Sequence, residues 1–203
     1  MLDLLYGASG ERLTRAEFKA DYGKRFASAG SHDSWKLERL QNFREPENPA
    51  WKALVRGDWD DALRLIGEQR ADLEEMRRDV EARGIGLYRV RGVEEPVVPY
   101  VQWELHYLLL AAEYGETTRV ITPLQVEEFE TDRPLPELLT VGDDTAYCAF
   151  YDENGACTGA SRFIGVGIVA QCVEFIDHLY SEGEELSIFF QRRIAHMEPP
   201  VNP

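Results

Sequence analysis

Hydrophobic and polar residues change their spacing within residues 86–122, and we expect the rest of the chain to be organised around this stretch. Side chains alternate in 87–91 (Leu-Tyr-Arg-Val-Arg), which predicts a strand that ends before Pro96 because proline lacks a ladder donor. Apolar residues then recur every three or four positions over 98–112, which predicts a helix that buries one face. The β-branched segment 117–122 predicts a second strand. The pattern therefore indicates a parallel, right-handed βαβ unit.

Three short strands are predicted after this unit, over 138–141, 145–151 and 156–164. The Asn154-Gly155 pair between the last two is a strong hairpin signal, so the three strands are expected to form a meander. Helical spacing returns in two later segments, 168–180 and 186–196. We expect the meander and the βαβ unit to join in one mixed sheet with flanking helices, which makes the fold class α+β.

Three helices are predicted in the N-terminal part of the chain, over 14–29, 48–56 and 58–83. Thr14 and Glu17 have the spacing of a capping box, and the side chains of Asn48 and Asp58 are suited to cap the next two helices. The segment 35–43 is compatible with a short strand or with irregular structure. Helices therefore dominate the expectation for this part of the chain.

The length of 203 residues fits one domain, or one domain with a helical extension. We divide the chain into an N-terminal helical region, 1–84, and an α+β core, 85–197. The two are expected to form one compact domain. The proline-rich tail, 198–203, cannot continue a helix and is expected to fray.

The chain carries 37 acidic and 22 basic residues, which gives a formal net charge of -15. Phosphate backbones are bound by clustered Lys and Arg, so direct nucleic-acid binding is not predicted, and neither is binding to an anionic membrane surface. The acidic balance would suit a basic protein partner.

The three cysteines (Cys148, Cys157 and Cys172) are odd in number and lack metal-ligand spacing, so we expect reduced thiols. No apolar run reaches the ~18 residues of a membrane span. The first residues, Met-Leu-Asp-Leu-Leu-Tyr, have no basic region before their leucines and do not resemble a secretory signal. These features predict a cytoplasmic protein.

No phosphate-binding loop, nucleophile elbow or His-Glu-x-x-His motif occurs, so no cofactor or metal is predicted, and enzymatic activity is left open. Cys148 or Cys157 could meet His106 in space to form an activated thiol. The alternative for Cys148, which falls in an apolar strand, is a buried and inert thiol.

The candidate binding site belongs to the βαβ unit. Arg89 and Arg91 share one face of the first strand, Glu104 follows on the helix, and Arg119 falls on the second strand. Guanidinium groups in this arrangement could hold an anionic ligand through bidentate bonds. The alternative is an internal ion-pair network that fixes the helix on the sheet. The candidate ligand-binding residues are Arg89, Arg91, Tyr100, Trp103, Glu104 and Arg119.

An aromatic stripe follows the first predicted helix, with Phe18, Tyr22 and Phe26 at four-residue intervals. Such a stripe is typical of a partner-binding face or of ordinary core packing. The spacing alone does not decide between the two.

Several segments carry a family resemblance: 89–105 (RVRGVEEPVVPYVQWEL), 113–120 (EYGETTRV), Asp143-Asp144, 151–155 (YDENG) and Gly159-Ala160, with a weaker match at 35–38. Over roughly 35–180 the chain resembles a bacterial, mainly actinobacterial, family of domains of unknown function. The resemblance implies a small cytoplasmic protein, often encoded beside helix-turn-helix regulators, with a regulatory partner and no known catalytic residues. The chain departs from this family in its long helical insert, 58–83, and in the segment before Asp143.

Two hypotheses of function follow. The first is a non-enzymatic, acidic regulatory accessory that docks onto a basic or DNA-binding protein partner. The second is a sensor or enzyme for an anionic small molecule, with an Arg/Glu pocket beside the central sheet.

Overall fold

The computed structural model describes residues 5, 10–131 and 133–200. The prediction that the first six residues are not a secretory signal rests on a segment of which only Leu5 is described. The last three residues of the predicted tail, 201–203, also lie outside it. Within the described part of the tail, the carbonyl of Glu198 accepts a hydrogen bond from the Gln102 side chain at 3.0 Å.

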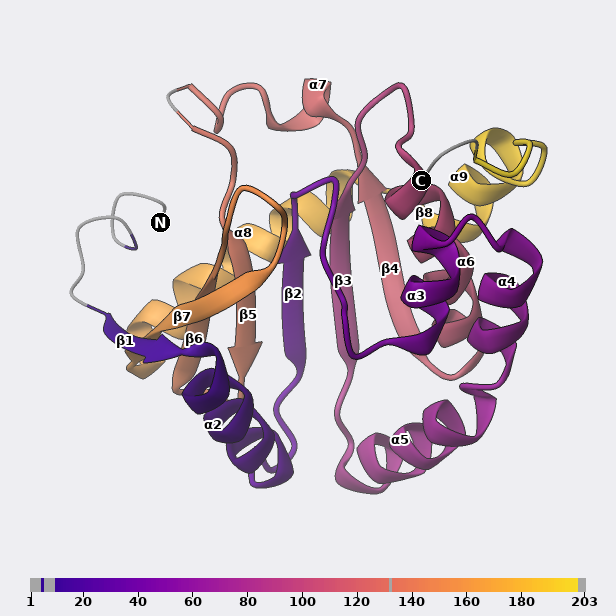
Figure 1. Ribbon diagram of the computed structural model, residues 1–203. Coiled ribbons are helices and arrows are strands. Elements are labelled where there is room, and N and C mark those ends of the chain that lie inside the picture. Colours follow the sequence, from indigo (N-terminus) through magenta and orange to yellow (C-terminus); the bar gives the residue numbers. More distant parts are fainter. Residues whose placement is uncertain (1–4, 6–9, 132, 201–203) are drawn as a thin grey trace.

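One mixed sheet of eight strands forms the centre of the described structure (Figure 1). The strands are β1 (Glu11–Thr14), β2 (Ser34–Glu38), β3 (Leu87–Gly92), β4 (Glu116–Ile121), β5 (Glu137–Val141), β6 (Thr145–Tyr151), β7 (Cys157–Ile164) and β8 (Glu184–Glu185). Their order across the sheet is β1-β7-β6-β5-β2-β3-β4-β8. β2, β3 and β4 run parallel, and the other neighbouring pairs are antiparallel.

The predicted βαβ unit is present as β3, α6 (Pro99–Glu113) and β4, with β3 and β4 adjacent and parallel. The predicted meander is present as β5, β6 and β7. β5 pairs antiparallel with β2, which joins the meander to the parallel strands. The single mixed sheet and the α+β fold class are therefore confirmed.

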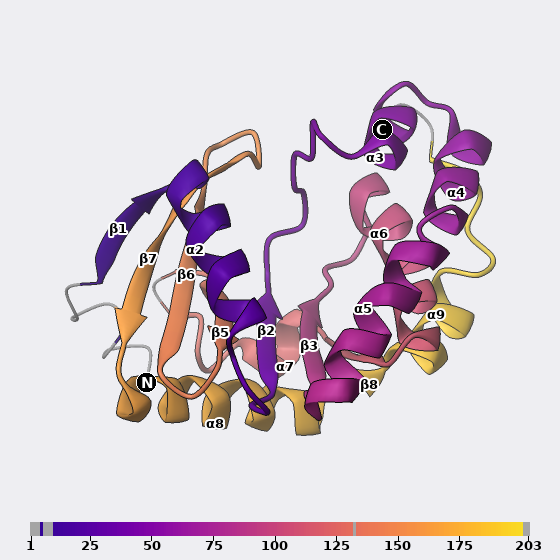
Figure 2. The same ribbon diagram turned by 90° about the horizontal axis from the view of Figure 1, so that it is seen from below.

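Helix α8 (Val166–Glu182) lies across one face of the sheet (Figure 2). Because side chains alternate along each strand, every second residue of the central strands points toward this helix. The buried core between α8 and the sheet includes Leu37, Val90, Ile121, Leu138, Ala146, Phe163, Val169, Cys172, Ile176 and Leu179. This face of the sheet is thus filled by apolar packing.

The opposite face is covered in two separate parts (Figure 2). α2 (Arg15–Ala27) packs near the meander end, where it adjoins β7, β1 and β5. Near β3 and β4 lies α6, against which α4 (Trp59–Gly67) and α9 (Leu186–Arg193) pack, with α3 (Pro49–Val55) on α4. The remaining helices are α5 (Arg70–Arg83) and the short α7 (Pro123–Val126). The middle of this sheet face lies between the two parts.

The prediction of a single helix over 58–83 is wrong, because the structure has two helices there, α4 and α5. The chain leaves α4 at Gly67, and the amide of Gln69 donates to the carbonyl of Ile66 in a tighter turn. Glycine disfavours a helix interior by about 1 kcal/mol relative to alanine, which makes this position a favourable break.

Two strands are present that the sequence did not predict, β1 and the two-residue β8, at the two edges of the sheet. The undecided segment 35–43 contains β2 followed by irregular chain. The N-terminal region is therefore not purely helical, since β1 and β2 belong to the central sheet.

Candidate functional site

A cleft lies on the sheet face opposite α8, between α2 and the layer that contains α6. It consists of two adjoining chambers of about 540 and 460 Å³, which we term the α2 chamber and the α6 chamber. Residues from α2, β2, β3, α6 and β6 therefore meet there from distant parts of the sequence. Both chambers are lined by Arg15, Lys36, Arg89, Tyr107, Tyr151 and Cys157.

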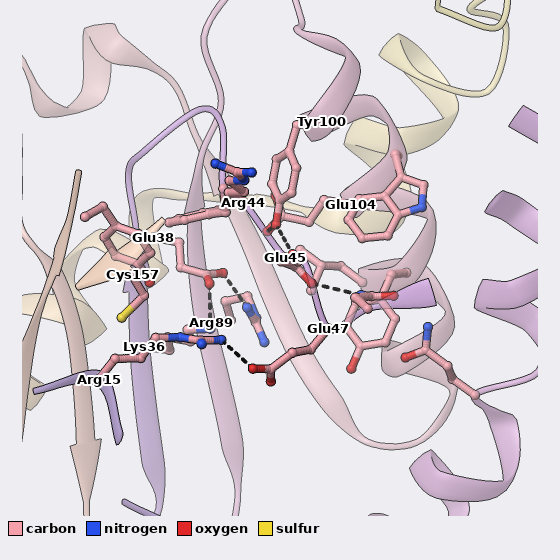
Figure 3. Close-up of a pocket in the computed structure, with 17 residues that line it drawn as sticks. Arg15, Lys36, Glu38, Arg44, Glu45, Glu47, Arg89, Tyr100, Glu104 and Cys157 are labelled. Atoms are coloured by element: carbon pink, nitrogen blue, oxygen red, sulfur yellow. Dashed lines mark hydrogen bonds and ion pairs between the residues drawn. The ribbon is translucent and has the colours of Figure 1, made fainter. Parts of the chain in front are cut away.

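The floor of the cleft is a row of alternating charges on β2 and β3. Lys36 and Arg89 are directly paired in the parallel register, and their side chains point to the cleft face. Lys36 Nζ lies 2.5 Å from the Glu38 carboxylate, which also pairs with Arg89 (Figure 3). On its other side, Arg89 Nε donates to Glu116 at 2.5 Å. The Arg89 guanidinium is thus held in one position by two carboxylates.

The charge row changes the ionisation of its central carboxyl. Burial alone would raise the pKa of Glu38, but the nearby cations Arg89 and Lys36 outweigh burial and hold that pKa below its ordinary value. Glu38 is therefore ionised across the neutral pH range. Glu38 stays charged even though its side chain is only 8% exposed.

A second charged group lies at the α6 end. Arg91 is completely buried, and its Nε donates to Glu104 Oε2 at 2.7 Å. Its Nη1 donates to the Gly92 carbonyl at 2.7 Å, whereas Nη2 has no hydrogen-bond partner among the described residues. Burial raises the pKa of Glu104, although Arg91 opposes that rise. Arg91 on β3 therefore holds Glu104 of α6 in place from the side of the sheet and does not itself line the cleft.

Tyr100 connects Glu104 to the loop that precedes α3. Its hydroxyl donates to Glu45 Oε1 at 2.6 Å and lies 3.4 Å from Glu104 Oε1 (Figure 3). Asn48 Nδ2 donates to the other oxygen of Glu45 at 2.8 Å. This network fixes one wall of the α6 chamber.

The candidate residues named from sequence are only partly brought together. Four of the six line the α6 chamber: Arg89, Tyr100, Trp103 and Glu104. Arg119 lies on the opposite face of the sheet, where its guanidinium stacks over the Tyr180 ring of α8 and donates to the Gly183 carbonyl. Its register partner is Val90, whose side chain belongs to the core under α8. The expected cluster of Arg119 with Arg89 and Arg91 is therefore not formed.

The aromatic stripe of α2 forms the other wall of the cleft. Phe18, Tyr22 and Phe26 line the α2 chamber and also pack against a small core that includes Tyr147 of β6, whose ring contacts those of Phe18 and Tyr22. All residues of α2 are described, and none of its side chains is fully buried. The stripe therefore combines partial core packing with a surface that faces open space.

Two charged residues on the same helix reach across the mouth of the cleft. Arg15 Nη2 lies 3.1 Å from the carboxylate of Glu47, in the loop before α3 (Figure 3). Lys19 Nζ lies 3.1 Å from the same carboxylate. The capping box of Thr14 and Glu17 fixes the start of α2, so Arg15 is the first residue of a well-defined helix. These ion pairs connect the two walls.

Several lining residues were missed from the sequence, above all Lys36, Glu38 and Glu47. The alternation of Trp-Lys-Leu-Glu in β2 has period two and was a usable signal for Lys36 and Glu38. Glu47 carries no such signal, because its partners on α2 are about 30 positions away in the chain.

The thiol–imidazole pair considered from sequence has no support in the structure. His106 packs against Trp59 and Phe190 and does not line the cleft. Burial raises the pKa of the Cys148 thiol to about 11, which disfavours the thiolate. Cys157 lines both chambers, and its thiol donates to the Gly159 carbonyl at 3.7 Å.

Within the described residues, no group of three or more His, Cys, Asp or Glu side chains is placed to hold a metal ion. Among the described helices, none combines the length and the apolar character that crossing a membrane requires.

The fold and the cleft define an α+β domain with a polar-floored cavity on one face of a mixed sheet. A family model described as a domain of unknown function, DUF6879, matches residues 20–191, and the chain belongs to this family. No curated protein matches the chain.

Among solved structures, the chain is similar to TrmBL2, described as an archaeal chromatin protein with a novel mode of DNA binding. The two chains share 11% identity with a TM-score of 0.42. The similarity covers 91% of this chain but only 59% of TrmBL2. A likeness this distant has no bearing on function.

Proposed function

We propose that the protein binds a small anionic organic molecule in the cleft and acts as a sensor of that molecule. The observation that carries this proposal is the placement of Lys36 and Arg89 on the floor of an aromatic-walled cavity, in a chain whose net charge is -15. Ligand sites are typically concave and mostly apolar, with a few fixed polar groups that orient the ligand. The two chambers, at about 460 and 540 Å³, fall within the usual size range of such sites.

The rigidity of Arg89 supports binding. Its two carboxylate partners hold the guanidinium in place before a ligand arrives, so little side-chain entropy is lost on binding. Lys36 is more accessible: its side chain is 36% exposed, and its ion pair with Glu38 can give way when Nζ turns toward a ligand. The pair thus offers one fixed and one adjustable cation.

A thermal-shift screen of anionic metabolites tests this proposal. A ligand that binds only the folded state stabilises it by about 2.7 kcal/mol at a hundred times its Kd. For a chain of this length, that stabilisation corresponds to a Tm increase of roughly 5–10 °C.

The screen is repeated with Lys36→Met and with the matched control Lys52→Met, which removes an exposed lysine on α3 outside the cleft. We expect a ligand that raises the Tm of the wild type and of Lys52→Met but does not raise the Tm of Lys36→Met. A hit that both variants retain would place binding elsewhere and refute the proposed site.

The second candidate function is docking of this acidic protein onto a basic partner. The resemblance to a family often encoded beside helix-turn-helix regulators suggests a DNA-binding protein as that partner, in the cytoplasm. The specific observation in its favour is an exposed patch around α7, where Leu124 is 81% exposed next to the exposed carboxylates of Glu127 and Glu128. A surface patch with an apolar residue beside acidic residues is suited to bind a basic surface of a partner protein.

Co-purification followed by affinity measurements at low and high salt tests the docking function. An affinity for a basic partner that falls with salt, and that Glu127→Lys weakens further, is the expected result. A monomer that retains no basic partner at low salt would count against it.

A further inference from the structure

The two chambers of the cleft differ in their carboxylates. The α6 chamber combines four cations with four acids: Arg15, Lys36, Arg44 and Arg89 with Glu38, Glu45, Glu47 and Glu104. The α2 chamber combines four cations with one acid: Arg15, Lys19, Lys36 and Arg89 with Glu116. Glu47 and Glu38, which pair with Arg15 and Lys36, lie on the α6 side, whereas Arg89 is shared between Glu38 and Glu116 of the α2 chamber. An anion therefore meets less repulsion in the α2 chamber than in the α6 chamber.

The α2 chamber also has the larger aromatic and apolar surface. Phe18, Tyr22 and Phe26 face it from α2, and Tyr107 and Leu139 face it from the opposite wall and from the sheet. The Tyr22 and Phe26 rings stack on each other, with their centroids 5.8 Å apart and an interplanar angle of 23°. Aromatic side chains favour offset-stacked or edge-to-face contacts with other aromatic groups.

From these two features we propose that the α2 chamber is a site for a planar aromatic anion, and that Glu47 competes with this anion for Arg15 and Lys19. The inference rests on the proposed ligand-binding function and specifies its ligand. The ring system of the ligand lies against the aromatic wall, and its carboxylate, sulfonate or phosphate lies beside Lys36 and the α2 cations.

Glu47 is placed to act as an internal competitor. Its carboxylate takes up one donor from Arg15 and one from Lys19, each at 3.1 Å, and its side chain is 61% exposed. Exposed ion pairs of this kind contribute little to stability, so an incoming anion displaces the Glu47 carboxylate at small cost. Displacement also separates the loop before α3 from α2, which widens the cleft mouth.

A pair of fluorescent dyes tests the inference directly. 8-Anilinonaphthalene-1-sulfonate carries a planar aromatic body and one sulfonate, and N-phenyl-1-naphthylamine is the same molecule without the sulfonate. Titration of the full chain with each dye gives two Kd values. Their ratio isolates the contribution of the negative charge.

Two substitutions should move the ratio in opposite directions. Glu47→Gln removes the competitor and should tighten sulfonate-dye binding about two- to five-fold, the range expected for loss of an exposed ion pair. Lys36→Met should weaken it by about tenfold or more. Neither should change the Kd of the neutral dye by more than about twofold.

Matched controls come from positions outside the cleft. Glu81 pairs with Arg77 on α5 and is 60% exposed, so Glu81→Gln repeats the chemical change of Glu47→Gln at a distant site. Lys52→Met does the same for Lys36→Met. Both controls should leave both Kd values unchanged. Leu139→Trp, which fills the floor of the α2 chamber, should abolish saturable binding of both dyes.

The outcomes separate the two proposals. If Glu47→Gln alters both dyes equally or alters neither, the anion site with its competitor is refuted while ligand binding in the cleft stands. If Leu139→Trp leaves both titrations unchanged, the dyes do not bind in the cleft, and both the inference and the proposed ligand site fail.

Discussion

Glu137 is the group whose replacement should most clearly change the pH dependence of stability. It is the first residue of β5, and its Oε1 accepts hydrogen bonds from the backbone amides of Arg39 at 2.8 Å and Leu40 at 2.6 Å. Its Oε2 is buried and has no hydrogen-bond partner among the described residues. Burial, together with repulsion from the ionised Glu38, raises the pKa of Glu137 to about 7. In the folded protein the Glu137 carboxyl is therefore mostly neutral below about pH 7.

The sign and size of the effect follow from this shift. The folded pKa is above the ordinary value of 4.5, so the neutral carboxyl stabilises the fold below pH 4.5, and this stability is lost as the pH rises through 7. At 1.36 kcal/mol per pH unit, the interval from 4.5 to 7 amounts to about 3 kcal/mol. Glu137→Gln keeps an oxygen for the two amides and cannot ionise. The variant should be about 1 kcal/mol more stable than wild type at pH 5 and about 3 kcal/mol more stable at pH 8.

Urea unfolding at pH 5, 6, 7 and 8 measures this difference for wild type and Glu137→Gln. The exposed Glu153→Gln serves as the control for the chemical change, and its difference from wild type should stay near zero at every pH. A Glu137→Gln difference that stays constant between pH 5 and pH 8 would refute the proposed ionisation of Glu137.

Three further perturbations have defined outcomes. Burial opposes ionisation of Asp21, but its hydrogen bonds and ion pairs lower its pKa to about 2, so it contributes stability above pH 4 that is lost as the pH falls through 2. Asp21→Asn should cost about 1 kcal/mol in urea unfolding at pH 7, after allowance for solvent screening. Arg91→Ala should cost about 3–5 kcal/mol because Glu104 is left buried without its ion-pair partner, and the double variant Arg91→Met with Glu104→Leu should recover most of that loss in the same assay. Burial raises the pKa of the Cys148 and Cys172 thiols from 9 to about 11, so iodoacetamide at pH 8 should alkylate them about 100-fold more slowly than in urea, as followed by mass spectrometry.

Local signals in the sequence predicted most of the fold. The period-two alternation of β3, the capping box at Thr14 and the Asn154-Gly155 hairpin signal all act over a few residues, and each element lies where its signal placed it. The two-residue β8 was missed because a strand this short has no period to detect. The break at Gly67 was missed because one glycine is often tolerated inside a helix.

The arrangement of the site depends on register, which the sequence did not reveal. Arg119 was grouped with Arg89 and Arg91 because all three belong to the two strands of the βαβ unit. In the structure, Arg119 pairs with Val90, and this register puts the Arg119 side chain on the α8 face of the sheet. A shift of one residue along a strand moves each side chain to the opposite face. The contact of Arg15 with Glu47 depends on how α2 and the loop before α3 fold over the sheet, and no local pattern encodes that approach.

The structure also bears on the two interpretations of the arginine cluster that the sequence left open. A buried ion pair rarely stabilises a fold more than apolar residues of the same volume would, so charges on an inner sheet face call for another explanation. For Arg91 and Glu104, packing is sufficient, because Arg91 is closed off from the cleft and fixes α6 on β3. Arg89 and Lys36 differ, because they face open volume on the floor of the cleft. A charged floor beneath an unfilled aromatic cavity is poorly explained by stability, and this contrast favours ligand binding at Arg89 and Lys36 over a purely structural network.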